Sequence, residues 1–259
     1  MSFLPIDGRA YHYRDVGQGR PVLLLHGFPL TGASFWPQLD AVPKGVRLIV
    51  PDHRGFGQSA RGEGPLSIDG FAADALALLE ALKISQATVG GVSMGGYIAM
   101  ALLRADPSRV DRLVLIDTQC NADDEAGKAK REATAVEVET TGLDSLVETM
   151  LPKLLASKAP DEVRRRVEEL MRSVDPKTVA AASRAMAGRP DSRELLSRFA
   201  GPSLVVVGTE DAITPVAKAR ELAALMAGSR RVELEGAGHL SNLEKPEAFN
   251  AALAEFLAF

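Results

Sequence analysis

The chain has 259 residues, of which 46% are hydrophobic and 25% are charged, and its formal net charge is −4. This length suits one large domain or a core with one insertion, and the composition excludes a disordered chain. The acidic balance argues against nucleic-acid binding, which needs a basic surface. Cys120 is the one cysteine, so we expect no intrachain disulfide. No apolar run suits a signal peptide or a membrane span, so we expect a cytoplasmic protein with no membrane partner.

Short apolar runs recur along the chain and predict strands. Residues 3–6 and 10–16 are expected to form a hairpin around Asp7-Gly8, a favoured two-residue turn. Runs without polar alternation follow at 21–27, 46–52, 87–93, 112–117 and 203–211. Such runs are typical of strands that are buried on both faces of a parallel sheet. A last strand is expected at "RRVELE", 230–235.

Helical patterns lie between these runs. The first covers 67–84, the next covers 94–105 and ends before Pro107, and the last begins at Pro246. Each carries apolar residues at the spacing of one helix face. The alternation of strands with helices predicts an α/β fold with a mostly parallel central sheet.

One segment breaks the alternation. Residues 121–190 contain no strand-like run but do contain amphipathic helical patterns, such as 161–173 and 175–186. The second of these begins with Asp175 as a candidate cap and with Pro176 at the first helical position. We expect a helical cap, 121–190, inserted after the sixth strand into a core formed by 1–120 and 191–259. Ordinary flanking helices are the alternative.

A single serine lies among glycines at the junction of a predicted strand and helix. Gly91-Val92-Ser93-Met94-Gly95 has the G-x-S-x-G pattern of a nucleophile elbow, a tight turn that lifts a serine hydroxyl above the sheet. Residues without side chains let the turn close, and the helix N-terminus favours developing negative charge. The alternative is a glycine-rich turn with an incidental serine.

A nucleophilic serine needs a base and an acid partner. His239 lies in a glycine-bracketed loop after the last strand, and Asp211 follows another strand at the same edge of the sheet as Ser93. Asp117 and Glu210 remain alternatives for the acid. The four histidines form no short ligand pair, so we expect no metal and no cofactor.

The backbone N–H of Met94, directly after the serine, is the first expected oxyanion donor. The second is the N–H of Phe28 in "HGFP", because Pro29 has no N–H. His26 in the same stretch is expected to be structural. Pro29 and Trp36 are candidate walls of the substrate pocket.

The segments "LLLHGFP", "VPDHRGFGQS", "GGVSMGGYIAM", "LVLIDT", "VVVGTEDAITP" and "GAGHLSNLEKPEAF" together resemble the α/β-hydrolase superfamily. They are most similar to small capped carboxylesterases and to 3-oxoadipate enol-lactonase-like hydrolases. The resemblance implies that Ser93 is the nucleophile, His239 the base, Asp211 its partner, and Phe28 and Met94 the oxyanion donors. Pro29 lies beside the predicted oxyanion hole, and in this it resembles prolines of relatives that form peracids. This resemblance implies a perhydrolase side activity.

These observations predict a serine hydrolase that cleaves small to medium carboxylic esters. The segment 121–190 is rich in Ala, Leu and Met, so we expect fairly apolar substrates. Enol-lactone hydrolysis and C–C bond hydrolysis are alternatives with the same catalytic residues. A ligand receptor on the same fold is the non-enzymatic alternative.

Overall fold

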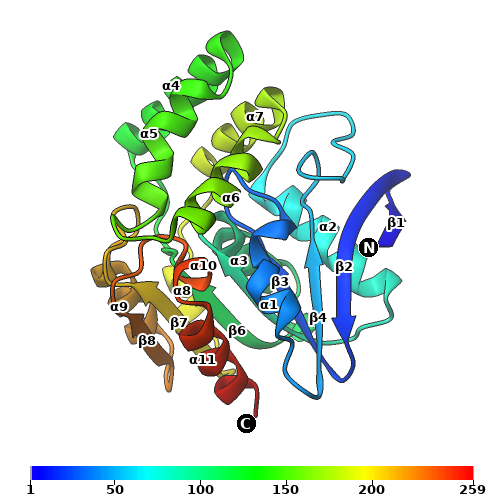
Figure 1. Ribbon diagram of the computed structural model, residues 1–259. Helices are drawn as coiled ribbons and strands as arrows, with labels where there is room; N and C mark the ends of the chain where they lie inside the picture. Colours follow the sequence, from blue (N-terminus) through cyan, green and yellow to red (C-terminus); the bar gives the residue numbers. More distant parts are fainter. Residues whose placement is uncertain (1, 259) are drawn as a thin grey trace.

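The computed structural model describes residues 2–258, in which helices cover both faces of an eight-stranded sheet (Figure 1). The strands pair in the order β1-β2-β4-β3-β5-β6-β7-β8. β1–β2 and β2–β4 are antiparallel, and the other pairs are parallel, which confirms the predicted α/β class. The bounds are β1 (Ser2–Ile6), β2 (Arg9–Gly17), β3 (Arg20–Leu25), β4 (Val46–Pro51), β5 (Ala87–Val92), β6 (Val110–Ile116), β7 (Ser203–Gly208) and β8 (Arg230–Leu234).

The hairpin at the start of the chain forms as predicted. Asp7 and Gly8 have φ values of 48° and 74°, and positive φ at both central residues is what a type I′ turn requires. This hairpin forms one edge of the sheet, and the candidate catalytic residues follow strands nearer its middle and far edge.

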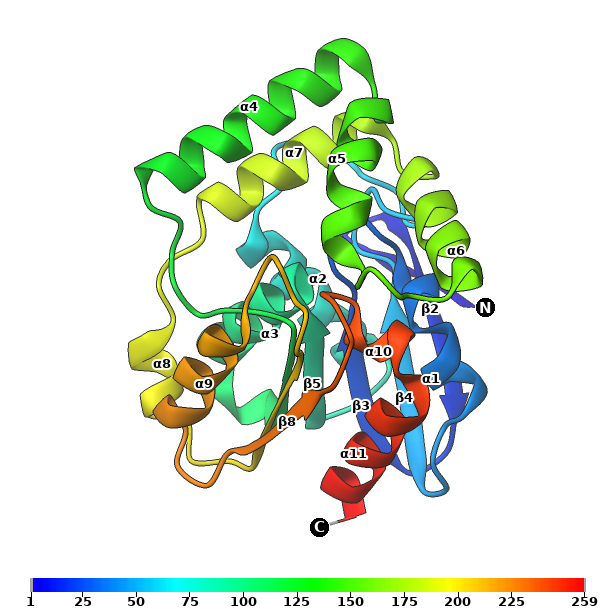
Figure 2. The same cartoon turned by 60° about the vertical axis from the view of Figure 1, so that its left-hand side comes forward.

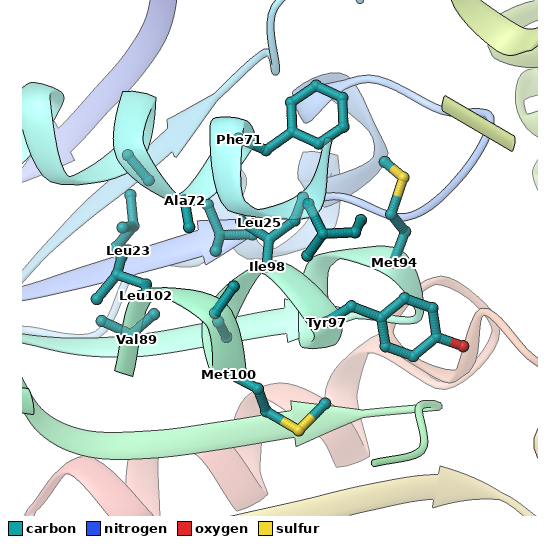
Figure 3. Packing of buried hydrophobic residues seen from close by; sticks show 14 of the residues in the cluster. Leu23, Leu25, Phe71, Ala72, Val89, Met94, Tyr97, Ile98, Met100 and Leu102 are labelled. Carbon is teal, nitrogen blue, oxygen red and sulfur yellow. The ribbon is translucent and has the colours of Figure 1, made fainter. Parts of the chain in front are cut away.

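The alternating side chains of the central strands build two apolar layers. Leu23 and Leu25 of β3 face one side, where they join Phe71 of α2 (Ile68–Ala81) and Ile98 of α3 (Met94–Ala105) in one buried cluster (Figure 3). Val22 and Leu24 belong to the opposite cluster, with residues of α11 (Pro246–Ala258). Each fully buried side chain of this size contributes about 1.5–3 kcal/mol. The packed core therefore holds the loops at the ends of these strands in fixed positions.

Smaller elements complete the two layers. The first cluster also includes residues of α8 (Arg193–Ser197) and α9 (Val216–Leu225), and the second is joined by Trp36 and Leu39 of α1 (Trp36–Asp40). Two 3₁₀ turns, η1 (Gly32–Phe35) and η2 (Pro107–Arg109), and the short α10 (Ser241–Glu244) connect the main elements.

Four helices between β6 and β7 lie at the carboxyl ends of the strands. They are α4 (Glu125–Thr141), α5 (Asp144–Leu154), α6 (Asp161–Arg172) and α7 (Pro176–Ala187), drawn green to yellow-green in Figures 1 and 2. The side chain of Asp175 accepts a hydrogen bond from the N–H of Lys177 at 2.8 Å, which confirms the predicted helix cap. Residues 121–190 enclose α4–α7 and leave α8 outside. No helix within residues 2–258 is both long and apolar enough to cross a membrane.

Candidate active site

Ser93 lies at a sharp turn between β5 and α3. Its backbone has φ 54° and ψ −113°, a conformation that residues other than glycine rarely adopt and that tends to occur at functional sites. The Ser93 N–H donates to the carbonyl of Ile116 at 2.9 Å, and Thr118 Oγ1 donates to the Ser93 carbonyl at 2.8 Å. Hydrogen bonds to the last residue of β6 and to the segment after it therefore hold the strained residue in place.

Glycine is required on both sides of this serine. A Cβ atom on Gly91 would lie 2.1 Å from the carbonyl carbon of Gly95. A Cβ atom on Gly95 would lie 2.0 Å from the carbonyl oxygen of Leu25 in β3. These distances are far shorter than any van der Waals contact, so the G-x-S-x-G pattern has the steric role that the sequence predicts.

His239 and Asp211 meet at the same edge of the sheet. Nδ1 of His239 lies 2.9 Å from Oδ2 and 3.0 Å from Oδ1 of Asp211, and both residues are buried. An N–H at Nδ1 donates to the carboxylate in this arrangement, which leaves Nε2 as the proton acceptor. The sequence therefore predicts this pair correctly as neighbours.

Two further residues orient the Asp211 carboxylate. The backbone N–H groups of Ile213 and Thr214 each donate to Oδ1 at 2.8 Å, and Thr214 Oγ1 donates to Oδ2 at 2.7 Å. Thr214 is not among the site residues predicted from the sequence. A threonine three residues after an acid, at a loop before a helix, is a signal that could have found it.

The two ionisable groups favour each other's charged form. Burial lowers the pKa of His239, but the adjacent Asp211 carboxylate outweighs burial, so the pKa is raised above its usual value. Burial raises the pKa of Asp211, but the charge of His239 and the hydrogen bonds from His239 and Thr214 outweigh it, so this pKa is lowered. The pair is thus suited to hold an imidazolium.

The two alternative acids occupy other positions. The carboxylate of Asp117 accepts hydrogen bonds from Gly208 N–H at 2.9 Å and from Ser241 Oγ at 2.6 Å and N–H at 3.0 Å. Burial and the nearby Asp211 carboxylate raise its pKa to about 7. Glu210 is exposed. Within residues 2–258, Asp211 is the acid that contacts Nδ1 of His239.

The predicted oxyanion donors flank the serine. A Cβ atom on Gly27 would lie 3.4 Å from Cβ of Ser93, so the 26–29 loop packs directly against the turn. Met94 is the first residue of α3, and neither its N–H nor that of Phe28 donates a hydrogen bond to another described residue. Both amides are therefore available to a ligand. The Phe28–Pro29 peptide bond is cis.

The other three histidines contact groups other than Ser93 and Asp211. Nδ1 of His26 lies 3.0 Å from the Gly27 carbonyl, and its Nε2 accepts from the His53 N–H at 3.1 Å. Burial lowers the pKa of His26 to about 3, so this ring is neutral. Nδ1 of His12 lies 2.8 Å from Oδ2 of Asp52, far along the chain from Ser93. No group of three His, Cys, Asp or Glu side chains within 2–258 is arranged to hold a metal.

A cavity of about 280 Å³ lies beside Phe28, a predicted oxyanion donor, and Thr214, which bonds to Asp211. Its core side includes Phe28, Tyr97, Ile213 and Thr214, and its other side is formed by α4, α5 and Ser183 of α7. A larger groove of about 720 Å³ lies between Arg61, Leu66 and α7 but includes none of the predicted site residues. The smaller cavity is the candidate substrate pocket, because it contacts the residue before Pro29 and the residue bound to Asp211.

The walls of this cavity differ from the apolar surface expected from composition. Leu146 and Met150 of α5 are part of it, but so are Lys130 and Arg131 of α4 and Lys153 of α5. Composition averages over whole helices, whereas the few residues that face the cavity decide its chemistry.

The two predicted pocket residues are not among those that line this cavity. The ring of Trp36 packs beneath the guanidinium of Arg166 on α6, 4.0 Å from ring centroid to Cζ. Pro29 is buried beside Phe28. The structure thus brings Ser93, His239, Asp211, Phe28 and Met94 to one edge and leaves Trp36 under a neighbouring helix.

A second residue missed by the sequence analysis fixes the loop of His239. The buried carboxylate of Glu244 accepts from Gly238 N–H at 2.8 Å and from Ala156 N–H at 2.9 Å. The Leu240 N–H donates to the carbonyl of Leu154, the last residue of α5, at 3.1 Å. The loop that carries His239 is therefore bonded to the end of α5. No local pattern in the sequence indicates this contact.

Comparison with known proteins shows the family to which this fold belongs. Residues 20–246 match the family described as the alpha/beta hydrolase fold. The chain is 32% identical to 3-oxoadipate enol-lactonase 2 of Acinetobacter baylyi, over 94% of this chain and 91% of that protein. It is 31% identical to a putative non-heme bromoperoxidase, BpoC, of Mycobacterium tuberculosis, over 95% and 97% of the two chains. A solved thermophilic esterase from Thermogutta terrifontis, with malate bound, is similar with a TM-score of 0.94 and 36% identity, covering 96% of this chain and 93% of the other.

Proposed function

The chain belongs to the alpha/beta hydrolase fold family, and we propose that it hydrolyses carboxylic esters through an acyl-enzyme intermediate on Ser93. The observation that carries the proposal is the strained turn at Ser93 together with the bonded His239–Asp211 pair at the same sheet edge. A serine held in this conformation has no structural purpose that a glycine would not serve better.

In the proposed reaction, Oγ of Ser93 attacks the ester carbonyl carbon while Nε2 of His239 accepts the hydroxyl proton. Asp211 keeps Nδ1 protonated and stabilises the imidazolium. The N–H groups of Phe28 and Met94 donate to the oxyanion of the tetrahedral intermediate, where losing one such donor typically costs about 100- to 1,000-fold in rate.

The intermediate then collapses. The bond between the carbonyl carbon and the alcohol oxygen breaks, and His239 gives its proton to the leaving alkoxide. A water molecule that loses a proton to His239 attacks the acyl-serine and releases the carboxylic acid. We infer that helices α4–α7 act as a cap, since α4 and α5 close the cavity on the side away from the sheet.

Lactones are the second candidate class. A lactone is a cyclic ester, so the same addition and collapse would open its ring with the alcohol and the acid still joined. The specific support is the 32% identity with a relative named an enol-lactonase.

The first experiment is turnover of 4-nitrophenyl esters from acetate to decanoate by the wild type and by Ser93→Ala. We expect a chain-length optimum among the shorter acids, set by the 280 Å³ cavity, and a loss of at least about 1,000-fold in kcat in the variant. Equal turnover by both proteins would exclude Ser93 as the nucleophile. Turnover of lactones but not of linear esters would favour the second class.

A further inference from the structure

Three basic side chains line the cavity on its helical side. Lys130 and Arg131 belong to α4, and Lys153 belongs to α5, and we refer to the three as the cationic wall. One carboxylate, that of Asp123, lines the same cavity. The charge on these four groups is therefore positive overall.

Asp123 does not neutralise the cationic wall. Its Oδ1 accepts a hydrogen bond from Arg189 Nη2 at 2.6 Å, and Arg189 is buried against the ring of Tyr97. Its Oδ2 accepts from Nε of Arg131 at 3.1 Å. Asp123 is thus shared between two arginines, and one unit of positive charge remains even before the lysines are considered.

Arg131 contacts Asp123 through Nε, and its two terminal nitrogens have no partner among the described residues. Lys130 and Lys153 take part in no ion pair within the same part of the chain. The end of a guanidinium is a planar fork that binds a carboxylate through two parallel hydrogen bonds. The cationic wall therefore offers this fork with two ammonium groups on the same cavity.

Three arginines elsewhere in the same helical segment are each paired with two carboxylates, whereas Arg164 and Arg166 take part in no ion pair among the described residues. Arg165 contacts Glu162 and Glu169, Arg172 contacts Glu168 and Asp144, and Arg184 contacts Glu132 and Glu139. In the cavity, Lys130 and Lys153 have no carboxylate partner among the described residues, and Arg131 shares its one partner with Arg189. A cavity wall with excess positive charge is suited to an anion supplied from outside.

The cationic wall also lies within electrostatic reach of the catalytic pair. Burial lowers the pKa of His239 most, and the charge of Arg131 lowers it as well, although the net shift is upward. A substrate anion at Arg131 would therefore be near the reacting group and not at a remote surface.

We propose that the cationic wall binds a carboxylate of the substrate, so that the enzyme prefers esters or lactones that carry a negative charge away from the scissile bond. This inference rests on the proposed hydrolysis at Ser93. It replaces the expectation of fairly apolar substrates with a specific class: half-esters of dicarboxylic acids, or esters of hydroxy acids with a free carboxylate.

The test compares each anionic ester with its neutral methyl ester. 4-Nitrophenyl hydrogen glutarate carries the charge on the acyl side, and 4-acetoxybutanoate carries it on the alcohol side. We expect kcat/KM for at least one of them to exceed that for its methyl ester about 10-fold, and this preference to decrease as salt is added. Equal or lower kcat/KM for both anionic esters would overturn the proposal.

Three variants test whether the cationic wall causes the preference for anionic esters. In Arg131→Gln and Lys153→Gln, the ratio of kcat/KM for the anionic and neutral esters should fall about 10-fold and a few-fold, respectively. Lys153→Gln breaks no ion pair. It therefore still tests the cationic wall if Arg131→Gln, which loses its contact with Asp123, does not fold. Lys44→Gln makes the same charge change on an exposed residue before the amino end of β4, and it should leave the ratio unchanged. A ratio that falls equally in all three variants would contradict the assignment.

Binding separates this inference from the proposed function. Calorimetry of glutarate with the Ser93→Ala protein needs no turnover. Glutarate binding that weakens about 10-fold in Ser93→Ala/Arg131→Gln would support the cationic wall even if no ester were hydrolysed, in which case the proposed function alone would fail. Absence of binding, or equal binding by both proteins, would overturn the cationic wall and leave hydrolysis at Ser93 to stand on its own test.

Discussion

Both carboxylate oxygens of Asp211 lie within 3.0 Å of Nδ1 of His239, whereas Asp117, which follows the neighbouring strand, bonds to Ser241 and Gly208. The pKa of Asp117 is raised to about 7, first by burial and second by the nearby Asp211 carboxylate. Proximity to His239 therefore does not distinguish the two acids, whereas contact with the imidazole does.

Replacing Asp211 with Asn should abolish most of the activity. An amide can donate to Nδ1, which would move the imidazole proton to Nε2, and it cannot stabilise the imidazolium. We expect kcat to fall about 1,000- to 10,000-fold in Asp211→Asn. Glu210→Gln is the matched control, because this neighbouring acid is exposed, and its kcat should stay within twofold of the wild type. Comparable losses in both variants would contradict the assignment of Asp211.

The pH dependence follows from the raised pKa of His239. Burial lowers this pKa, but Asp211 outweighs burial and the net shift is upward. His239 must be neutral to accept a proton, so kcat/KM should fall as the pH decreases through this pKa, and the fall should begin above the ordinary value of about 6.5. A profile of kcat/KM against pH, which reports on the free enzyme, measures this. An acid limb well below pH 6 would contradict it.

Asp117→Asn should move that acid limb to lower pH. Burial and Asp211 dominate the pKa of His239, and Asp117 adds a further upward contribution while Arg131 opposes it. Because the pKa of Asp117 is itself about 7, part of its charge is already lost at the acid limb, so we expect a small shift when asparagine removes the rest and keeps the Asp211 contact. The variant should also lose about 1–3 kcal/mol of unfolding free energy, because the Ser241 N–H then faces an amide nitrogen instead of an acceptor. A lowered stability with an unmoved acid limb would make Asp117 structural only.

The strands could be predicted because a parallel sheet buried on both faces needs continuous apolar runs. The predicted run at 203–211 extends three residues beyond β7, which ends at Gly208. No clear signal in the sequence separates the strand from the loop that carries Asp211. The positions of Ser93, Asp211 and His239 could also be predicted, because each directly follows or lies shortly after a strand, and the carboxyl ends of parallel strands share one edge.

The lining of the 280 Å³ cavity could not be predicted in the same way. Which residues of α4 and α5 face the cavity depends on how these helices pack over the sheet, and amphipathic periodicity does not report that. The sequence makes Trp36 a candidate aromatic of the core or of a pocket wall, but Arg166, 130 positions later, covers its ring. The bond from Glu244 to Ala156 likewise joins residues that only the folded chain brings together.

Gly95→Ala tests the steric requirement at the turn. The added Cβ would lie 2.0 Å from the Leu25 carbonyl oxygen, which belongs to the backbone of β3 and has no side-chain freedom to move away. We expect a loss of at least about 3 kcal/mol of unfolding free energy, measured by urea denaturation, and loss of activity. Gly188→Ala adds the same atom 3.8 Å from its nearest neighbour and should leave both unchanged. A stable, active Gly95→Ala protein would mean that α3 can shift away from β3.

Glu244→Gln should weaken both stability and catalysis, because this side chain bonds the loop before His239 to the segment after α5. Two backbone N–H groups, of Gly238 and Ala156, donate to its two carboxylate oxygens. A glutamine has one oxygen, so its amide group would oppose one of these donors and leave a buried N–H unpaired. We expect a loss of about 1–3 kcal/mol of unfolding free energy and a fall in kcat as His239 becomes less well positioned. Glu148→Gln, an exposed position on α5, is the control for the loss of one negative charge. If the variant lost stability but kept the kcat of the wild type, Glu244 would anchor α5 without positioning His239.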